Sequence, residues 1–119
     1  MKIYVSHSTQ YNFKEELYKP LKNSKIYSKH QIILPHDNSD ELFNSKDLFN
    51  SGCDCVIAEV STQSLGIGIE LGWANSNDIQ IICIYRKGCR LSSALKKISM
   101  TFIEYETEQD LLVKLEHYL

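Results

Sequence analysis

The amino-acid sequence predicts a single-domain α/β fold built on one parallel, doubly wound sheet. Short apolar runs alternate with segments of helical periodicity along the whole chain. The connections are short, and no repeat, linker or low-complexity tract interrupts the alternation. The length of 119 residues suits one domain with one core, so residues 1–119 are expected to form a single unit.

Two strands and a helix are predicted in the first part of the chain. The strands span residues 2–6 and 31–34, and the second ends at Pro35-His36. One face of the helix between them carries apolar residues at every fourth position: Phe13, Leu17 and Leu21. Pro20 should kink or end this helix because proline disrupts a helix interior.

A second helix is predicted between residues 38 and 52. Asn38 and Glu41 have the spacing of a capping box, which marks a helix start. Gly52 is expected to stop the helix. Its apolar side chains are Leu42, Phe43 and Phe49.

The rest of the chain is organised around residues 54–74. Residues 55–60 are rich in β-branched residues and predict a buried strand, and a polar turn over residues 61–64 follows. Beyond the turn, apolar residues fit both a strand and a helix: Leu65, Ile67, Ile69, Leu71 and Trp73. We prefer the helix, because Gly66, Gly68 and Gly72 would leave a strand with little to pack.

The C-terminal part supplies a fourth strand at residues 79–85, a short helix at 92–98 and a fifth strand at 100–103. Thr107 is expected to cap a final helix. Five such units with right-handed crossovers predict a flavodoxin-like strand order, 2-1-3-4-5. This order has its switch point between the first and third strands, where Ser6, His7 and Ser8 would meet the turn to Ser64.

Glu70 is the main candidate for a functional side chain. Helical side chains lean toward the N-terminus, so Glu70 should point back over Gly66, which has no side chain. A carboxylate would then face the mouth of a strand–turn–helix unit, where open α/β sheets bind ligands. A different interpretation is that the glycines only permit close packing of the helix on the sheet.

The segment Ala58-Glu-Val-Ser-Thr-Gln-Ser-Leu-Gly-Ile-Gly-Ile-Glu-Leu-Gly-Trp-Ala74 resembles the signature of the nucleoside 2-deoxyribosyltransferase superfamily. It is most similar to the pattern of the 2'-deoxynucleoside 5'-monophosphate N-hydrolases, Ala-Glu-Val, a few polar residues, then Ser-Leu-Gly-x-Gly-x-Glu-Leu-Gly-x-Ala. The resemblance extends more weakly over most of the chain, and it implies the same flavodoxin-like fold. It also implies cleavage of an N-glycosidic bond in a nucleoside or nucleotide.

The resemblance implies a role for several single positions. Glu70 matches the catalytic glutamate that attacks the anomeric carbon of a deoxyribosyl group. Asp47 is the candidate for the acid that protonates the base, although it lies one residue closer to Asp54 than the family spacing gives. The alternative for Asp47 is a solvated residue on a polar helix face.

The expected substrate-binding residues are Tyr4, Ser6, Ser8, Ser64, Gly66, Gly68 and Ser93. Tyr4 matches a tyrosine of the sugar pocket, or is simply a half-buried strand residue. Ser64 matches a serine that contacts the 5'-phosphate, and it also suits the N-cap of the helix. Ser93 matches a serine that reaches the phosphate of a neighbouring subunit, which implies a homodimer or higher oligomer. Gln10 stands where the nucleotide hydrolases carry a phosphate-binding arginine.

Two other functions stay open at this stage. Residues 5–8, Val-Ser-His-Ser, resemble the start of TIR domains, which cleave NAD with a glutamate, but the segment 58–74 is not a TIR motif. A nucleotide-binding sensor without catalysis is the other alternative, and it has no need of a carboxylate facing an anionic ligand. His36 follows a strand end, and we leave it outside the catalytic set as a loop histidine.

The charge, the apolar runs and the cysteines of the sequence limit the partners and the cellular location that it predicts. The net charge of −2 gives no sign of binding to a nucleic-acid polymer or an anionic membrane. No apolar run approaches the roughly 20 residues that span a bilayer, and a signal-peptide pattern is missing, so a cytoplasmic protein is expected. Cys55 and Cys83 fall in apolar strands, and Cys53-x-Cys55 lacks the spaced partners of a zinc site. Neither a metal nor another cofactor is therefore expected.

Overall fold

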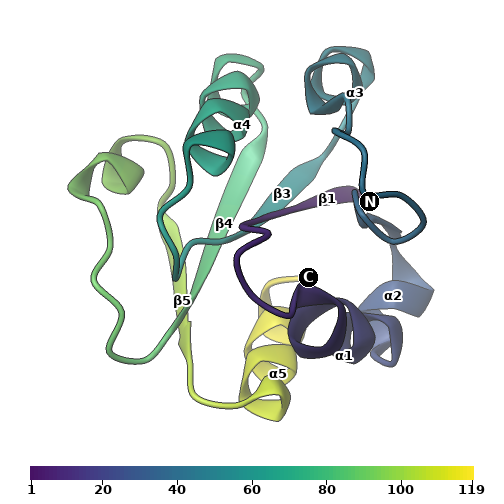
Figure 1. The fold of residues 1–119 in the computed structure, drawn as a ribbon, viewed down its shortest axis with the longest axis vertical. Coiled ribbons are helices and arrows are strands. Elements are labelled where there is room, and N and C mark those ends of the chain that lie inside the picture. Colours follow the sequence, from purple (N-terminus) through teal and green to yellow (C-terminus); the bar gives the residue numbers. More distant parts are fainter.

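The computed structural model describes all residues from 1 to 119 and contains one sheet of five parallel strands. The strand order is β2-β1-β3-β4-β5, so the predicted α/β fold and strand order are confirmed (Figure 1). The strands are β1 (Lys2–His7), β2 (Gln31–Ile33), β3 (Cys55–Glu59), β4 (Gln80–Arg86) and β5 (Thr101–Tyr105).

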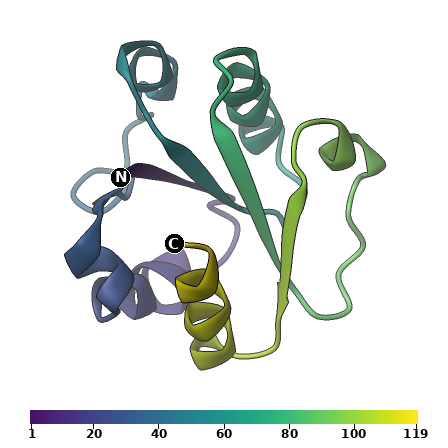
Figure 2. The same cartoon turned by 180° about the vertical axis from the view of Figure 1, so that it is seen from behind.

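Helices cover both faces of the sheet, as the two opposite views show (Figures 1 and 2). One face carries α3 (Ser45–Ser51) and α4 (Leu65–Ser76). The other carries α1 (Lys19–Lys22), α2 (Lys25–Lys29) and α5 (Glu108–Tyr118). Two short elements complete the chain: η1 (Lys14–Tyr18), a single π-helical turn that leads into α1, and η2 (Ser93–Lys97), a 3₁₀ turn.

Each face of the sheet has its own apolar core, because neighbouring side chains of a strand point to opposite faces. Ile3 and Val5 of β1 pack on the side of α1 and α5. Tyr4 lies in the other core with Ile67 and Leu71 of α4. The alternation along β1 therefore turns Tyr4, and with it Ser6 two residues later, toward α4.

The first helical segment is confirmed, including its end near Pro20. The π-helical turn η1 continues without a break into α1, so Pro20 lies late in one helical segment, which ends at Lys22. Proline lacks the backbone N–H that a helix interior uses, which favours an end at this point. The five-residue helix α2 was not predicted, since it is too short to show a repeating apolar pattern.

The predicted capping box at Asn38 and Glu41 is wrong. Helix α3 begins at Ser45, and its N-cap is Asn44, whose side chain accepts a hydrogen bond from the N–H of Asp47 at 3.2 Å. Glu41 belongs to the preceding loop, where its N–H donates to the hydroxyl of Ser39. Such local side-chain bonds compete with helix formation. The predicted stop at Gly52 is confirmed, with Gly52 at φ 127°, a backbone conformation that favours glycine.

Residues 65–76 form a helix, which settles the ambiguous apolar pattern in favour of the preferred interpretation. Ser64 is its N-cap, and Thr107 caps α5 as predicted. The short helix predicted at residues 92–98 is present as the 3₁₀-helix η2. None of the helices is long and apolar enough to cross a membrane.

Burial raises the pKa of the Cys55 thiol to about 12 and that of the Cys83 thiol to about 11, in keeping with their place in the strands.

Close packing of α4 on the sheet does not explain its glycines. A Cβ atom added to Gly68 or Gly72 would meet no heavy atom within 4 Å. We expect Gly72→Ala to raise the free energy of unfolding by about 0.5–1 kcal/mol, because alanine loses less backbone entropy in a helix. Urea unfolding of the parent and the variant measures this difference. A lower urea midpoint for Gly72→Ala than for the parent would show that another group occupies the space beside Gly72 in solution.

Candidate active site

Three side chains from two distant parts of the chain meet between β1 and α4. The hydroxyl of Tyr4 donates a hydrogen bond to Oε2 of Glu70 at 2.6 Å. The hydroxyl of Ser6 donates to Oε1 of Glu70 at 2.8 Å. Both carboxylate oxygens are thus held by donors from one strand, and the half-buried Glu70 has a fixed orientation.

The surroundings of Tyr4 keep its phenol protonated, so that it remains a hydrogen-bond donor. The residue is 2% exposed, and burial together with the neighbouring Glu70 raises the pKa of its phenol far above the ordinary value. A protonated phenol next to a carboxylate stabilises the negative charge without competing for a proton. The phenol of Tyr4 therefore stays a hydrogen-bond donor to the side chain of Glu70.

Glu70 lies on the wall of a cavity of about 580 Å³. Tyr4, Ser64 and Gly66 also line this cavity. Its apolar walls come from three segments of the chain and include Pro35, Phe43, Ile69 and Trp73. The size and the mixture of apolar walls with few polar groups are typical of small-molecule sites.

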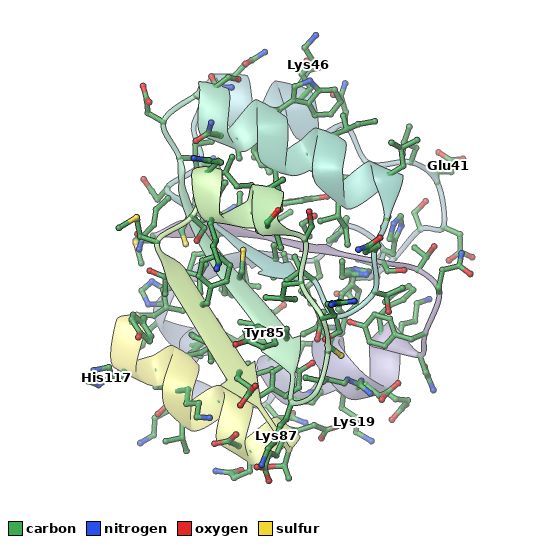
Figure 3. All side chains as sticks on the ribbon, turned by 90° about the vertical axis from the view of Figure 1, so that its left-hand side faces the viewer. Lys19, Glu41, Lys46, Tyr85, Lys87 and His117 are labelled. Atoms are coloured by element: carbon green, nitrogen blue, oxygen red, sulfur yellow. The ribbon has the colours of Figure 1, made fainter.

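The loop before α3 and α3 itself flank the helix that carries Glu70. Figure 3 shows Glu41 and Lys46, which belong to these two segments, beside α4. Phe43 lies with its ring centroid 5.5 Å from that of Tyr4, and the ammonium of Lys46 lies 5.9 Å from the centroid of Trp73. These contacts hold two of the aromatic walls against the body of the protein.

The predicted substrate-binding residues do not all meet at this cavity. Ser8 is buried, and its hydroxyl accepts a hydrogen bond from the N–H of Gln10 at 3.0 Å, while Thr9 lines the cavity. Gly68 lines a second cavity of about 600 Å³ on the other side of α4, which Ser64 also borders. Ser93 is exposed on η2, and its neighbours Ser92 and Ala94 line the second cavity.

Asp47 lies outside the cavity wall. It is exposed, and its carboxylate accepts a hydrogen bond from Nδ2 of Asn44 at 2.8 Å. Asn44 itself lines the cavity. The structure therefore connects Asp47 to the cavity through the amide of Asn44.

His7 and His36, which the sequence-based set left out, also line the cavity. Nδ1 of His7 donates to the carbonyl of Ser8 at 2.9 Å, which fixes the proton on this nitrogen. Nε2 then accepts from the hydroxyl of Tyr18 at 2.7 Å, and the same hydroxyl accepts from the N–H of His36 at 3.0 Å. The network attaches the loop at His36 to β1. Loop residues such as His36 and Asn44 carry no periodic signal that would have identified them.

Burial lowers the pKa of His7 from its ordinary value of 6.5. The folded protein therefore binds this proton less readily than the unfolded chain, and the free energy of unfolding should fall as the pH drops below about 6.5. One such group contributes a slope of at most about 1.4 kcal/mol per pH unit. Urea unfolding at several pH values should show a smaller slope for His7→Gln than for the parent. Equal slopes would contradict a neutral, buried His7.

A second polar cluster lies at the ends of β3, β4 and β5. Glu59 is 2% exposed, accepts a hydrogen bond from the N–H of Ser61 at 2.6 Å, and also accepts one from the hydroxyl of Tyr105. The N–H of Arg86 donates to the hydroxyl of Ser61 at 2.8 Å, and its guanidinium bonds Glu16 at 2.6 Å. These bonds fix the turn between β3 and α4.

No group of three or more histidine, cysteine, aspartate or glutamate side chains is arranged to hold a metal ion.

No protein-family model matches the chain. It is 47% identical over 51 residues to a putative 2'-deoxynucleoside 5'-phosphate N-hydrolase 1 from Nematostella vectensis. This match spans 41% of the chain and 33% of the relative, so it covers only a third of that protein.

The fold has a counterpart among solved structures. The structure of the CMP N-glycosidase BcmB from Clostridium botulinum superposes with a TM-score of 0.74 and 20% sequence identity, over all of both chains. This likeness supports the fold, and the sequence match supports the similarity to 2'-deoxynucleoside 5'-phosphate N-hydrolases. The resemblance of this chain to the nucleoside 2-deoxyribosyltransferase superfamily is thereby confirmed.

Proposed function

We propose that this protein cleaves the N-glycosidic bond of 2'-deoxyribonucleosides or their 5'-monophosphates, with Glu70 as the nucleophile. The observation that carries the proposal is the position of Glu70 on the cavity wall, with each carboxylate oxygen held by a hydroxyl of β1. A carboxylate fixed in this way stabilises the oxocarbenium-like transition state of glycoside cleavage.

The reaction proceeds in two steps. An oxygen of Glu70 forms a bond to the anomeric carbon while the bond to the base nitrogen breaks, and the bonding electrons leave with the base. A water molecule then attacks the glycosyl ester, which releases the sugar and restores the carboxylate. The water loses one proton in this step, and this proton balances the one that the departing base takes up. The phenol of Tyr4 and the hydroxyl of Ser6 keep the carboxylate in place through both steps.

The two ends of the cavity suit the two ends of a nucleotide. The aromatic rings of Phe43 and Trp73 provide flat apolar surface for a base. Ser64, at the N-terminus of the twelve-residue helix α4, suits a 5'-phosphate. Its hydroxyl lies 3.5 Å from the N–H of Ile67, a long capping contact that leaves the hydroxyl proton free to donate to an anion.

Gln10 replaces the phosphate-binding arginine that the resemblance implies, which removes a charge-assisted contact. We therefore expect monophosphates to be accepted with a small advantage over nucleosides. Water is the expected acceptor of the sugar, since the remaining surface of this short chain offers little for a second base.

One experiment tests the proposed reaction against its alternatives. The protein is incubated with deoxynucleosides, deoxynucleotides and NAD in parallel, and the released base is measured by chromatography. Base from the deoxy substrates supports the proposal, release of nicotinamide from NAD supports a TIR-like glycosidase, and no release supports a binding protein. Adding a different free base distinguishes transfer from hydrolysis, because a transferase forms the exchanged nucleoside or nucleotide.

The sites are proposed to be shared between subunits, with Ser93 reaching the phosphate bound by a neighbour. Leu65 is 83% exposed and Ile69 is 46% exposed, one turn apart on α4 between the two cavities. Apolar surface of this kind is typical of an interface. Light scattering at assay concentration should therefore give at least twice the chain mass of 13.7 kDa. A fully active monomer would exclude Ser93 from the site.

A further inference from the structure

Asn44 offers the cavity a polar group whose orientation is already fixed. It lines the cavity beside Phe43, and both polar atoms of its amide are bound to Asp47. Nδ2 donates to Oδ2 of Asp47 at 2.8 Å, and Oδ1 accepts from the backbone N–H of Asp47 at 3.2 Å. The side chain thus makes two bonds to one neighbouring residue.

These partners settle which end of the amide is which. A backbone N–H only donates, so the atom that faces it must be the oxygen of Asn44. A carboxylate only accepts, so the atom that faces Oδ2 must be the nitrogen. One N–H donor of Nδ2 and one lone pair of Oδ1 remain unused. Asn44 can therefore offer a ligand a donor and an acceptor side by side.

A donor beside an acceptor is the pattern that an amide uses to bind the edge of a nucleobase. The cavity that Asn44 lines also contains Glu70, the aromatic wall at Trp73 and the polar residue Ser64 at the N-terminus of α4. We propose that Asn44, oriented by Asp47, hydrogen-bonds the edge of the departing base and sets the base preference of the enzyme. This inference rests on the proposed function and assigns the part of the site that recognises the base.

Asn44→Ser is the variant that separates recognition from folding. Serine keeps an N-cap oxygen for α3, so the melting temperature should change little, but the amide is lost. Asn50→Ser is the matched control, because Asn50 is exposed near the other end of the same helix. The measured quantity is kcat/KM for the four common deoxynucleoside 5'-monophosphates. The ratio of best to worst substrate should fall about tenfold in Asn44→Ser and stay unchanged in Asn50→Ser.

The role of Asp47 in this inference is that of a positioning residue, and two variants test it. Base preference is measured here as the ratio of the dissociation constants of the four nucleotides, which does not depend on proton donation by Asp47. Asp47→Asn keeps an oxygen that accepts from Asn44, so this ratio should persist. Asp47→Ala removes the acceptor, so the ratio should shrink as in Asn44→Ser, with no further change in the double variant. A double variant with fully additive losses would overturn the positioning role.

Failure of the inference is separable from failure of the proposed function. If the parent releases no base, the proposed reaction is wrong, and the same four nucleotides are then titrated by calorimetry. The ratio of their dissociation constants should again shrink about tenfold in Asn44→Ser. The assignment of Asn44 would be overturned if the ratio of best to worst nucleotide in Asn44→Ser stayed within twofold of the parent's ratio, by kcat/KM or by dissociation constant. A parent that shows no base preference would overturn it as well.

Discussion

Glu70→Gln should abolish base release, with a loss in kcat on the order of 10³-fold or more, as expected for removal of a nucleophile. Glutamine has the size of glutamate but no negative charge, so it neither attacks the anomeric carbon nor stabilises an oxocarbenium-like centre. Chromatography of the released base gives the rate for the parent and the variant. Activity within tenfold of the parent would contradict the role of Glu70.

The same variant should fold as well as the parent. The hydroxyls of Tyr4 and Ser6 both donate to Glu70, and each hydroxyl is also able to accept from a glutamine amide. A partly desolvated carboxylate is costly for stability, so the melting temperature should be unchanged or higher. Glu116→Gln is the matched control, since Glu116 is an exposed carboxylate on α5, and it should retain full activity.

The sequence predicts the fold well because the local signals agree with the tertiary arrangement. Residues 65–76 carry an ambiguous apolar pattern, but the cap at Ser64 and the glycines favour the helix that the structure contains. The helix start predicted at Asn38 and Glu41 is wrong because the local signal there disagrees with the tertiary arrangement. A capping pattern is present there, but Phe43 packs on Tyr4 at 5.5 Å within a loop, and the helix starts only after it.

The candidate site is predictable only where it depends on regular structure. The lean of helical side chains is enough to direct Glu70 toward the strand ends, and strand alternation places Tyr4 and Ser6 on one face. Asn44 and His36 come from irregular loops, so no spacing rule brings them to the cavity. Ser8 follows the strand directly, but its hydroxyl is used within its own loop.

The proton donor for the departing base is the part of the mechanism that Asp47 is proposed to supply. In the structure its carboxylate is bonded to Asn44 at the edge of the cavity. Delivery of a proton from Asp47 would require it to release this bond and approach the base. Asp47→Asn is therefore the informative change, because it removes the acid and keeps a side chain of the same shape that can still hold Asn44.

If Asp47 acts as the general acid, the effect of Asp47→Asn must depend on the leaving group. Loss of a general acid costs about 10²–10⁴-fold for substrates whose base leaves poorly. A substrate with an activated base leaves without a proton and should lose much less. The test compares the parent and Asp47→Asn on a natural deoxynucleotide and on one with an electron-poor base, with Asp78→Asn as an exposed control.

An equal loss on both substrates would show that Asp47 acts only through structure. In that case the base departs with hydrogen bonds alone, which suits only bases that already stabilise negative charge. Rates for a series of substrates should then depend steeply on the basicity of the leaving nitrogen in the parent itself. A shallow dependence in the parent that becomes steep in Asp47→Asn would establish Asp47 as the acid.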